Sequence, residues 1–319
     1  EAATNAALAN SAHRIALDRL GRLREALALA ERLAAMGDPT GEAYLSIATI
    51  QAGLGDIPAA TATLDRAIAA AGGPGACPIP LLQMRAIRHF YVDGGASEHA
   101  ARLHAAAGER IESVPAFGRF DNRRDPDKPL KIGFVSPDFR AHSVMSFLLG
   151  PLAAFDRSRL SIHLYANVRK PDHLTARARE LAQGHRDVFK VPAAEAAKAV
   201  RADGIDILID LAGHTAGNRL DILARRPAPV QMTWLGYPYS SGMRRIHWRL
   251  TDATADPLDG PHDGYTERLL RLERFLCYAP REGIDPAAAR PAGPTVFGSF
   301  NNLDKYDDAS LDLWARAMV

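Results

Sequence analysis

Four short segments of the sequence combine glycine with side chains that can bind or react, and each follows a stretch typical of a β-strand. The segments are SPDFRAHSVMSF (136–147), LAGHTAGNRL (211–220), WLGYPYSSG (234–242) and FGSFNNLDKY (297–306). Their candidate residues are Asp138, His142, Gly213, His214, Thr215, Arg219, Gly236, Tyr237, Pro238, Asn301, Asn302 and Lys305. Ligands of open α/β sheets bind beyond the carboxyl ends of the strands, so this pattern predicts one site at a sheet edge.

Each segment also has a purely structural explanation. Asp138 can cap the helix that follows it, and His142 can be a histidine satisfied within the fold. The Gly-His-Thr and Gly-Tyr-Pro triplets can form turns, and Lys305 can be a solvated surface lysine. The pattern therefore predicts a site without defining its reaction.

Several other chemistries lose support because their motifs are missing. The chain has neither the G-x-G-x-x-G fingerprint of dinucleotide binding nor the G-x-x-x-x-G-K-S/T phosphate loop. It also lacks the H-E-x-x-H and cysteine patterns of zinc sites and the G-x-S-x-G turn of many hydrolases.

The elements that must position these residues lie mostly between residues 130 and 290. Strands are predicted at 130–136, 160–168, 187–192, 205–213 and 230–238, with two more segments at 244–252 and 267–273. Helices are predicted between them, at 177–184 and 193–204. Strands that alternate with helices indicate a parallel, Rossmann-like α/β sheet with crossover helices.

Residues 1–115 differ in composition, because they are rich in Ala, Leu, Arg and Glu and are predicted to be helical. Two stretches align without gaps, with Gly21 opposite Gly55. A period of about 34 residues, with glycine at the turn and small residues on the next helix, is typical of tetratricopeptide repeats. A third, degenerate helix pair is predicted from about 81 to 111, and the alternative is a generic alanine-rich bundle.

Composition divides the chain into four predicted parts: helical repeats over 1–115, a linker over 116–129, the Rossmann-like lobe over 130–290 and the start of another lobe over 291–319. In the last part, TVFGSFNN predicts a first strand, and a helix is predicted from Asp308. The sequence does not begin with methionine and stops inside this helix, so we expect it to be a fragment.

The 319 residues are 47% hydrophobic and 24% charged, which is ordinary for a soluble globular protein. A net charge of +2 gives no general attraction for nucleic acid or an anionic membrane. No apolar run approaches the ~18 residues of a membrane span, and no signal peptide is visible. Cys77 and Cys277 fit no metal or disulfide pattern, so we expect reduced, buried thiols in a cytoplasmic protein.

The four segments, in this order, resemble the tetratricopeptide-linked O-GlcNAc transferases. The resemblance runs almost continuously from Lys131 to Lys305, over more than half of the chain, and its most diagnostic stretch is RPAPVQMTWLGYP (226–238). It implies a GT-B glycosyltransferase, in which two Rossmann-like lobes face each other across a cleft. The segment 291–319 would then be the start of the second, UDP-binding lobe.

The resemblance implies an inverting, metal-independent enzyme that transfers N-acetylglucosamine from UDP-GlcNAc to serine or threonine hydroxyls of proteins. Asp138 and His142 would lie on the sugar and acceptor side of the cleft, with Asp138 a candidate in the proton path. Lys305 matches the lysine that offsets charge on the departing UDP, and no metal or cofactor is expected. The other implied contacts are Leu235, Gly236 and Asn302 for the nucleotide sugar, and His214, Thr215, Arg219 and Tyr237 for the sugar and peptide.

Two of the departures from the family pattern bear on activity, whereas those at His247 and Glu273 are expected to be neutral. The family often has a histidine near the acceptor, on the last helix before the linker, but residues 77–95 have none at the aligned position. His89 and His99 do not fit, so this role stays unassigned. Most of the UDP lobe would follow Lys305, so we expect the 319-residue chain to be inactive alone.

Two alternatives stay open. The same scaffold can serve a protein O-fucosyltransferase that uses GDP-fucose, or another nucleotide-sugar donor, because the donor-selective residues lie mostly in the second lobe. A non-enzymatic alternative is a tetratricopeptide protein-binding scaffold with a vestigial transferase lobe, although the retention of Asp138, His142 and Lys305 argues against it. Helical repeats bind extended peptides, which favours protein acceptors and allows a homodimer through the repeats.

Overall fold

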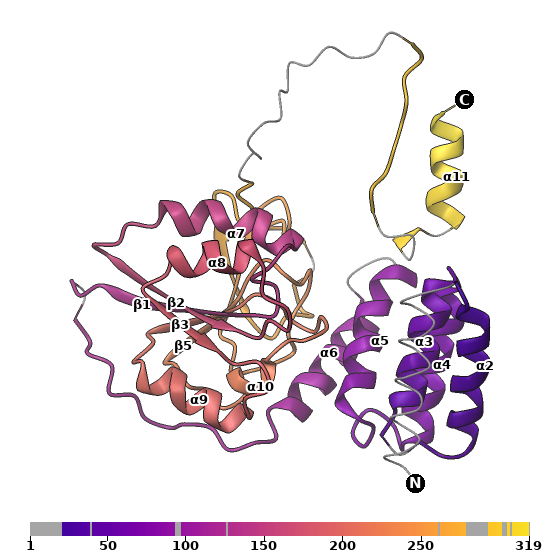
Figure 1. The fold of residues 1–319 in the computed structure, drawn as a ribbon, viewed down its shortest axis with the longest axis horizontal. Helices are drawn as coiled ribbons and strands as arrows, with labels where there is room; N and C mark the ends of the chain where they lie inside the picture. The colour runs from indigo at the N-terminus through magenta and orange to yellow at the C-terminus, as the bar shows by residue number, and fades with distance from the viewer. Residues whose placement is uncertain are drawn as a thin grey trace. The chain divides into compact units, whose positions relative to one another are not determined.

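The computed structural model describes residues 21–38, 40–92, 97–125, 127–260, 262–278, 293–301, 305–306 and 308–318. They belong to two compact units, of which the first comprises the described parts of Glu1–Gly73, Arg88–Gly94 and Pro280–Val319 (Figure 1). The second unit comprises the described parts of Pro74–Ile87 and Gly95–Ala279. Within the described residues, no helix is long and apolar enough to cross a membrane.

The predicted helical region is confirmed as a series of helices. They are α2 (Leu23–Ala35), α3 (Glu42–Gly53), α4 (Ile57–Ala70), α5 (Ile79–Val92) and α6 (Glu98–Ile111). Gly21 and Gly55, the aligned turn glycines, both adopt a positive φ, of 65° and 84°, which glycine tolerates best. Ala26 and Ala30 of α2 pack against Ile47 and Ile50 of α3, so small residues allow the close packing that the repeat pattern predicts.

The second unit is built on a sheet of seven parallel strands in the order β3-β2-β1-β4-β5-β6-β7. The strands are β1 (Leu130–Ser136), β2 (Leu160–Ala166), β3 (Gly184–Asp187), β4 (Ile207–Asp210), β5 (Val230–Thr233), β6 (Trp248–Asp252) and β7 (Arg268–Leu272). The chain moves outward from β1 to one edge and then from β4 to the other. This is the Rossmann-like arrangement that the sequence predicts.

Helices cover both faces of this sheet. Helices α7 (Ser143–Ala154) and α8 (His173–Glu180) lie on one face, and α9 (Ala193–Ala202) and α10 (Leu220–Leu223) lie on the other (Figure 1). Two separate apolar cores result, one on each side of the sheet. The core on the α9 and α10 side includes Ile111 of α6, so the last helix of the predicted repeat region packs with the sheet.

The strands predicted at 205–213, 230–238 and 244–252 are longer than β4, β5 and β6, and two further elements are shifted along the chain by three to five residues. The helix expected at 177–184 is α8, which begins earlier because Asp172 caps it and accepts the N–H groups of Leu174 and Thr175 at 2.9 and 3.1 Å. The strand expected at 187–192 is β3, and it begins at Gly184, which pairs with His163 of β2.

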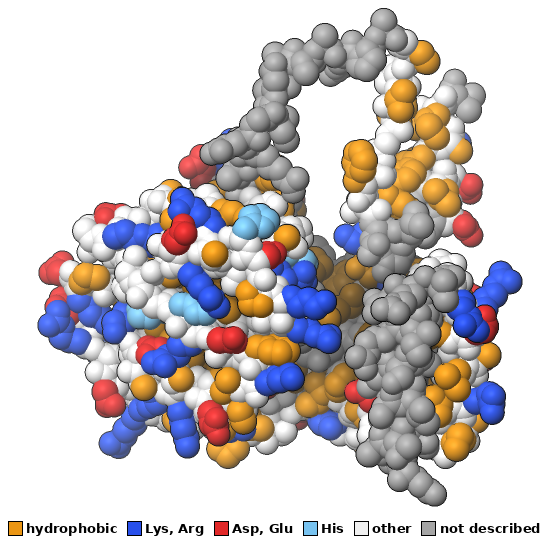
Figure 2. Space-filling model, in the orientation of Figure 1, with side chains coloured by type: hydrophobic (Ala, Val, Ile, Leu, Met, Phe, Trp, Pro, Cys, Tyr) orange, Lys and Arg blue, Asp and Glu red, His pale blue; other side chains and the backbone are white. Residues whose placement is uncertain are grey.

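The C-terminal segment corrects a further prediction. Residues 295–300 form no strand, and helix α11 (Asp308–Ala317) follows as expected. A strand needs a neighbouring strand to which its backbone is hydrogen-bonded, and the described residues of this segment pair with none. Val296, Phe297 and Phe300 are exposed. Figure 2 shows apolar side chains gathered over this segment and α11, whereas charges of both signs mix over the sheet-containing unit.

The expectation of two buried thiols is half right. Cys77 is buried, and burial raises the pKa of its thiol. Cys277 is exposed, because the chain beyond β7 leaves the sheet and residues 276–278 lie on the surface. Both cysteines are free.

Candidate active site at the carboxyl edge of the sheet

Three of the four predicted segments meet at one edge of the sheet. Strands β1, β4 and β5 are parallel neighbours, so the segments that follow them, 136–147, 211–220 and 234–242, leave the sheet side by side. The predicted residues Asp138, His142, His214, Gly236 and Tyr237 therefore belong to one edge. The prediction of a shared edge is confirmed for these three segments.

The loop after β1 places a buried carboxyl group beside a partly exposed histidine. Asp138 is 5% exposed, and its Oδ2 lies 3.6 Å from Nδ1 of His142, whose side chain is 37% exposed. Arg140 donates to the other carboxyl oxygen at 3.3 Å. His142, and not Asp138, is the N-cap of α7, where its Nδ1 accepts the N–H of Val144 at 3.3 Å.

Burial raises the pKa of Asp138, although the electrostatic interactions with His142 and Arg140 act in the opposite direction. A carboxylate with a raised pKa is a stronger base than an exposed one. His142 is the more exposed member of the pair, and because its Nδ1 accepts the N–H of Val144, a neutral ring carries its proton on Nε2. Of the two groups, Asp138 is therefore the one that can accept a proton.

The loops after β4 and β5 interlock through two glycines. A Cβ on Gly213, which has a φ of 54°, would lie 2.3 Å from the Cβ of Tyr237, and a Cβ on Gly236 would lie 1.8 Å from the carbonyl oxygen of Leu211. Leu235 adopts a φ of 74°, a conformation that costs energy for a branched side chain. These contacts fix the backbone at two predicted site positions, Leu235 and Gly236.

A buried carboxyl group shapes the loop after β4. Asp210 accepts the N–H groups of Ala212 and Gly213 at 3.2 and 2.7 Å and the hydroxyl of Thr233 at 3.0 Å. Burial raises the pKa of Asp210 to about 6. The hydroxyl of Thr215 donates to the carbonyl of Ala212 at 2.8 Å, so Thr215 forms the turn that the structural explanation predicts. Its contact with substrate stays a prediction.

His214 is buried behind the same loop. Its Nε2 lies 2.9 Å from the carbonyl oxygen of Ser241, and burial lowers its pKa to about 4, so the ring is neutral at pH 7. A neutral ring that donates from Nε2 leaves a lone pair on Nδ1. Among the described residues, this buried Nδ1 has no hydrogen-bond partner.

His104 on α6 is a site residue that the sequence analysis missed. It is fully buried, its Nδ1 lies 2.7 Å from the carbonyl oxygen of Ala100, and its Nε2 lies 2.7 Å from the hydroxyl of Tyr237. Its ring also packs edge-on against His214, at 5.3 Å between centroids. The last helix before the linker is α6, whereas the stretch 77–95, in which a histidine was expected, covers the preceding helix, α5.

Arg219 is held within the fold. Its guanidinium donates to the carbonyl oxygens of Val188 and Val191 at 2.6 and 2.9 Å and to the carboxylate of Asp221 at 3.0 Å. The side chain is 7% exposed. These contacts anchor the chain beyond β3, and the predicted contact of Arg219 with substrate stays a prediction.

The fourth predicted segment belongs to the first unit. Lys305 is exposed there, and Asn302 lies outside the described residues. Asp138 and His142 belong to the second unit, so their predicted proximity to Lys305 is untested. The roles of Lys305 and Asn302 stay predictions.

Comparison with known proteins gives concordant matches. The sequence model of glycosyl transferase family 41 matches residues 96–277. A protein of Oryza sativa, described as a probable UDP-N-acetylglucosamine–peptide N-acetylglucosaminyltransferase SPINDLY, is 40% identical over 245 residues, which cover 74% of this chain and 26% of that protein. The UDP-N-acetylglucosamine–peptide N-acetylglucosaminyltransferase of Caenorhabditis elegans is 36% identical over 142 residues, 44% of this chain and 12% of that protein.

A solved structure resembles the chain along its length. It is a lysine-to-methionine mutant of the Thermobaculum terrenum O-GlcNAc transferase, with a TM-score of 0.69 and 29% sequence identity, and the match covers 100% of this chain and 67% of that one. The chain spans about a quarter of the length of the SPINDLY relatives that it matches.

Proposed function

Because the chain belongs to glycosyl transferase family 41, we propose that the full-length protein transfers N-acetylglucosamine from UDP-GlcNAc to serine or threonine hydroxyls of protein acceptors. The names of the rice and nematode relatives support the donor and the peptide acceptor. The observation that carries the proposal is the Asp138–His142 pair, a buried base beside a partly exposed histidine at the carboxyl edge of a Rossmann-like sheet.

The proposed reaction is a single displacement that inverts the anomeric carbon. The acceptor hydroxyl attacks from the side opposite the UDP leaving group, and its proton passes to the Asp138–His142 pair. The raised pKa of Asp138 suits this task, because the carboxylate then holds the proton more firmly than an exposed one would. In this proposal His214 lies near the sugar and the acceptor, and its buried Nδ1 has no partner among the described residues.

The UDP leaving group carries the negative charge that develops in the transition state. In this proposal Lys305 and backbone amides offset that charge, so no metal ion is required. Asn302, Leu235 and Gly236 contact the nucleotide sugar, and Thr215, Arg219 and Tyr237 form the wall near the sugar and peptide. The helical repeats of 1–115 present protein acceptors and are the candidate surface for a homodimer. The cytoplasm is the proposed compartment.

Donor-dependent stabilisation tests the proposal directly. The full-length protein is heated with UDP, UDP-GlcNAc, GDP or no nucleotide, and transfer to an acceptor protein is followed by intact mass, with and without a chelator. We expect UDP and UDP-GlcNAc to raise the melting temperature, and acceptors to gain the mass of N-acetylglucosamine in the presence of chelator. Stabilisation by GDP alone would contradict the donor assignment, and binding of acceptor without transfer would favour the scaffold.

A further inference from the structure

The segment 237–241, called here the YPYSS loop, contacts both buried histidines of the site. The hydroxyl of Tyr237 lies 2.7 Å from Nε2 of His104, and the carbonyl oxygen of Ser241 lies 2.9 Å from Nε2 of His214. The position of this loop therefore determines a hydrogen bond of each ring.

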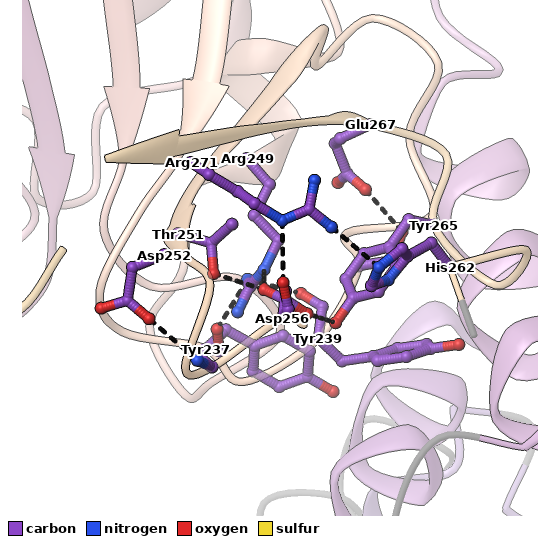
Figure 3. Close-up of polar contacts among 12 residues, drawn as sticks. Tyr237, Tyr239, Arg249, Thr251, Asp252, Asp256, His262, Tyr265, Glu267 and Arg271 are labelled. Carbon is purple, nitrogen blue, oxygen red and sulfur yellow. Dashed lines mark hydrogen bonds and ion pairs between the residues drawn. The ribbon is translucent and has the colours of Figure 1, made fainter. Parts of the chain in front are cut away.

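A buried arginine from β6 holds the first half of the YPYSS loop. Arg249 is 5% exposed, and its Nη1 donates to the carbonyl oxygens of Tyr237 and Tyr239, each at 3.0 Å (Figure 3). Its Nε lies 3.6 Å from Oδ2 of Asp256, so the carboxylate balances the guanidinium charge. Asp256 in turn accepts the hydroxyl of Tyr265 at 2.7 Å.

A buried glutamate holds the second half. Glu267, which directly precedes β7, is 5% exposed, and it accepts the N–H of Ser241 at 2.8 Å and the hydroxyl of Ser240 at 2.7 Å. The hydroxyl of Ser241 also donates to this carboxylate. The cation thus binds carbonyl oxygens of the loop, and the anion binds its N–H and hydroxyl groups.

Two buried charges on one short loop are costly, because each loses its hydration. Apolar side chains of similar size would pack as well at these positions. Ionised groups, in contrast, form directional hydrogen bonds that hold the atoms they bind in a defined orientation. Here the fixed atoms belong to the residues that bind His104 and His214. A shift of the loop would break the hydrogen bonds that the Nε2 atoms of both rings make with it.

We propose that Arg249 and Glu267 are positioning residues for the transfer reaction, acting through the YPYSS loop on His104 and His214. This proposal rests on the proposed function above. Through the loop, the two residues keep Nε2 of His104 as the acceptor of the Tyr237 hydroxyl and Nε2 of His214 as the donor to Ser241. Neither residue touches the reacting atoms.

The experiment uses the full-length protein with Arg249→Lys or Glu267→Gln. Lysine keeps the charge but cannot reach two carbonyls and Asp256 together, and glutamine keeps the shape but loses the charge. Arg157→Lys is the matched control, because Arg157 also donates to two carbonyl oxygens, those of Leu152 and Leu181, near the C-terminal ends of α7 and α8. The readouts are kcat, the KM for each substrate and the ¹⁵N signals of His104 and His214.

We expect kcat to fall about 10-fold to 100-fold in Arg249→Lys and Glu267→Gln, with the donor KM nearly unchanged, because small misplacements at a site cost rate more than binding. Arg157→Lys should keep the wild-type kcat. The histidine signals should move in the two loop variants and stay in place in the control.

Equal kcat in the loop variants and the control, or unchanged histidine signals in the loop variants, would overturn the proposal. If the wild-type protein transfers no sugar, the proposed function fails, and the histidine signals alone still decide the positioning role. If Arg249→Lys does not fold, Glu267→Gln reaches the same loop from the other side.

Discussion

The loop after β1 and the loop after β5 lie at the same edge of the sheet but use their polar groups differently. After β1, Asp138 and His142 are held by contacts of 3.3 to 3.6 Å, and His142 is partly exposed. After β5, Tyr237 and Ser241 are buried, and hydrogen bonds of 2.7 to 3.0 Å join them to His104, His214, Arg249 and Glu267. We infer that the polar side chains of the first loop keep capacity for substrate, whereas the buried polar groups of the second support the site.

The largest expected loss of turnover is that of Asp138→Asn. This substitution should lower kcat without lowering stability, and it therefore distinguishes a reacting residue from a supporting one. Loss of a general base costs about 10²-fold to 10⁴-fold in kcat. Stability should not fall, because the raised pKa shows that the folded protein disfavours the ionised carboxyl group. The wild type loses stability as the pH rises from the ordinary aspartate pKa to the raised one, and asparagine avoids this loss. Turnover assays and urea unfolding at pH 7 measure both quantities, and a large loss of stability would contradict the comparison.

Lys305→Ala extends the comparison to the first unit. We expect turnover of the full-length protein to fall about 10²-fold to 10³-fold, as for other groups that stabilise a leaving group, while the melting temperature stays constant because Lys305 is exposed. The matched control is Lys198→Ala, which removes an exposed lysine from α9. Near-normal turnover in Lys305→Ala would show that the lysine alignment is wrong.

Gly236→Ala tests the supporting side. The added methyl would meet the carbonyl oxygen of Leu211 at 1.8 Å, so we expect the free energy of unfolding to fall by about 3 kcal/mol. Gly118→Ala is the control, because nothing lies within 4 Å of the position that its methyl group would take, and its φ is not in the left-handed region. Urea unfolding compares the two, and an equal effect would mean that the loops do not interlock.

Asp210 gives the loop after β4, which interlocks with the loop after β5, a pH dependence of its own. Because its pKa rises to about 6 on folding, the unfolded chain loses this proton first, and stability falls as the pH rises from about 4 to 6. The change should be on the order of 3 kcal/mol. The measurement is the difference in unfolding free energy between the wild type and Asp210→Asn at each pH. A difference that does not vary over this interval would refute the assignment.

Much of the edge can be predicted from the sequence because it depends on local order. The buried runs at 130–136 and 205–213 predict strands, and parallel strands bring the residues after them to one edge. The sequence locates Asp138, His142, His214 and Tyr237 in this way.

The supporting contacts could not be predicted, because they join distant parts of the chain. His104 meets Tyr237 across 133 residues, and its only local signal is a histidine on the apolar face of α6. Arg219 donates to the carbonyl oxygens of Val188 and Val191, which follow β3. Because the sequence places β3 several residues too late, it does not reveal these partners and suggests only that Arg219 contacts the substrate. The strand expected at 295–300 would need a neighbouring strand to pair with, and the local sequence pattern does not reveal whether one is present.

Tyr237→Phe has the smallest expected effect. It tests whether a residue of the supporting loop also takes part in the reaction. Phenylalanine keeps the ring against Gly213 but removes the hydroxyl that donates to His104, so the buried Nε2 loses this hydrogen bond. We expect a loss of about 1 to 2 kcal/mol in unfolding free energy. Because the loop remains tied to Arg249 and Glu267, the loss of turnover should be smaller than in Asp138→Asn. A loss as large as that of Asp138→Asn would place Tyr237 among the groups that take part in the reaction and would end the distinction between the two loops.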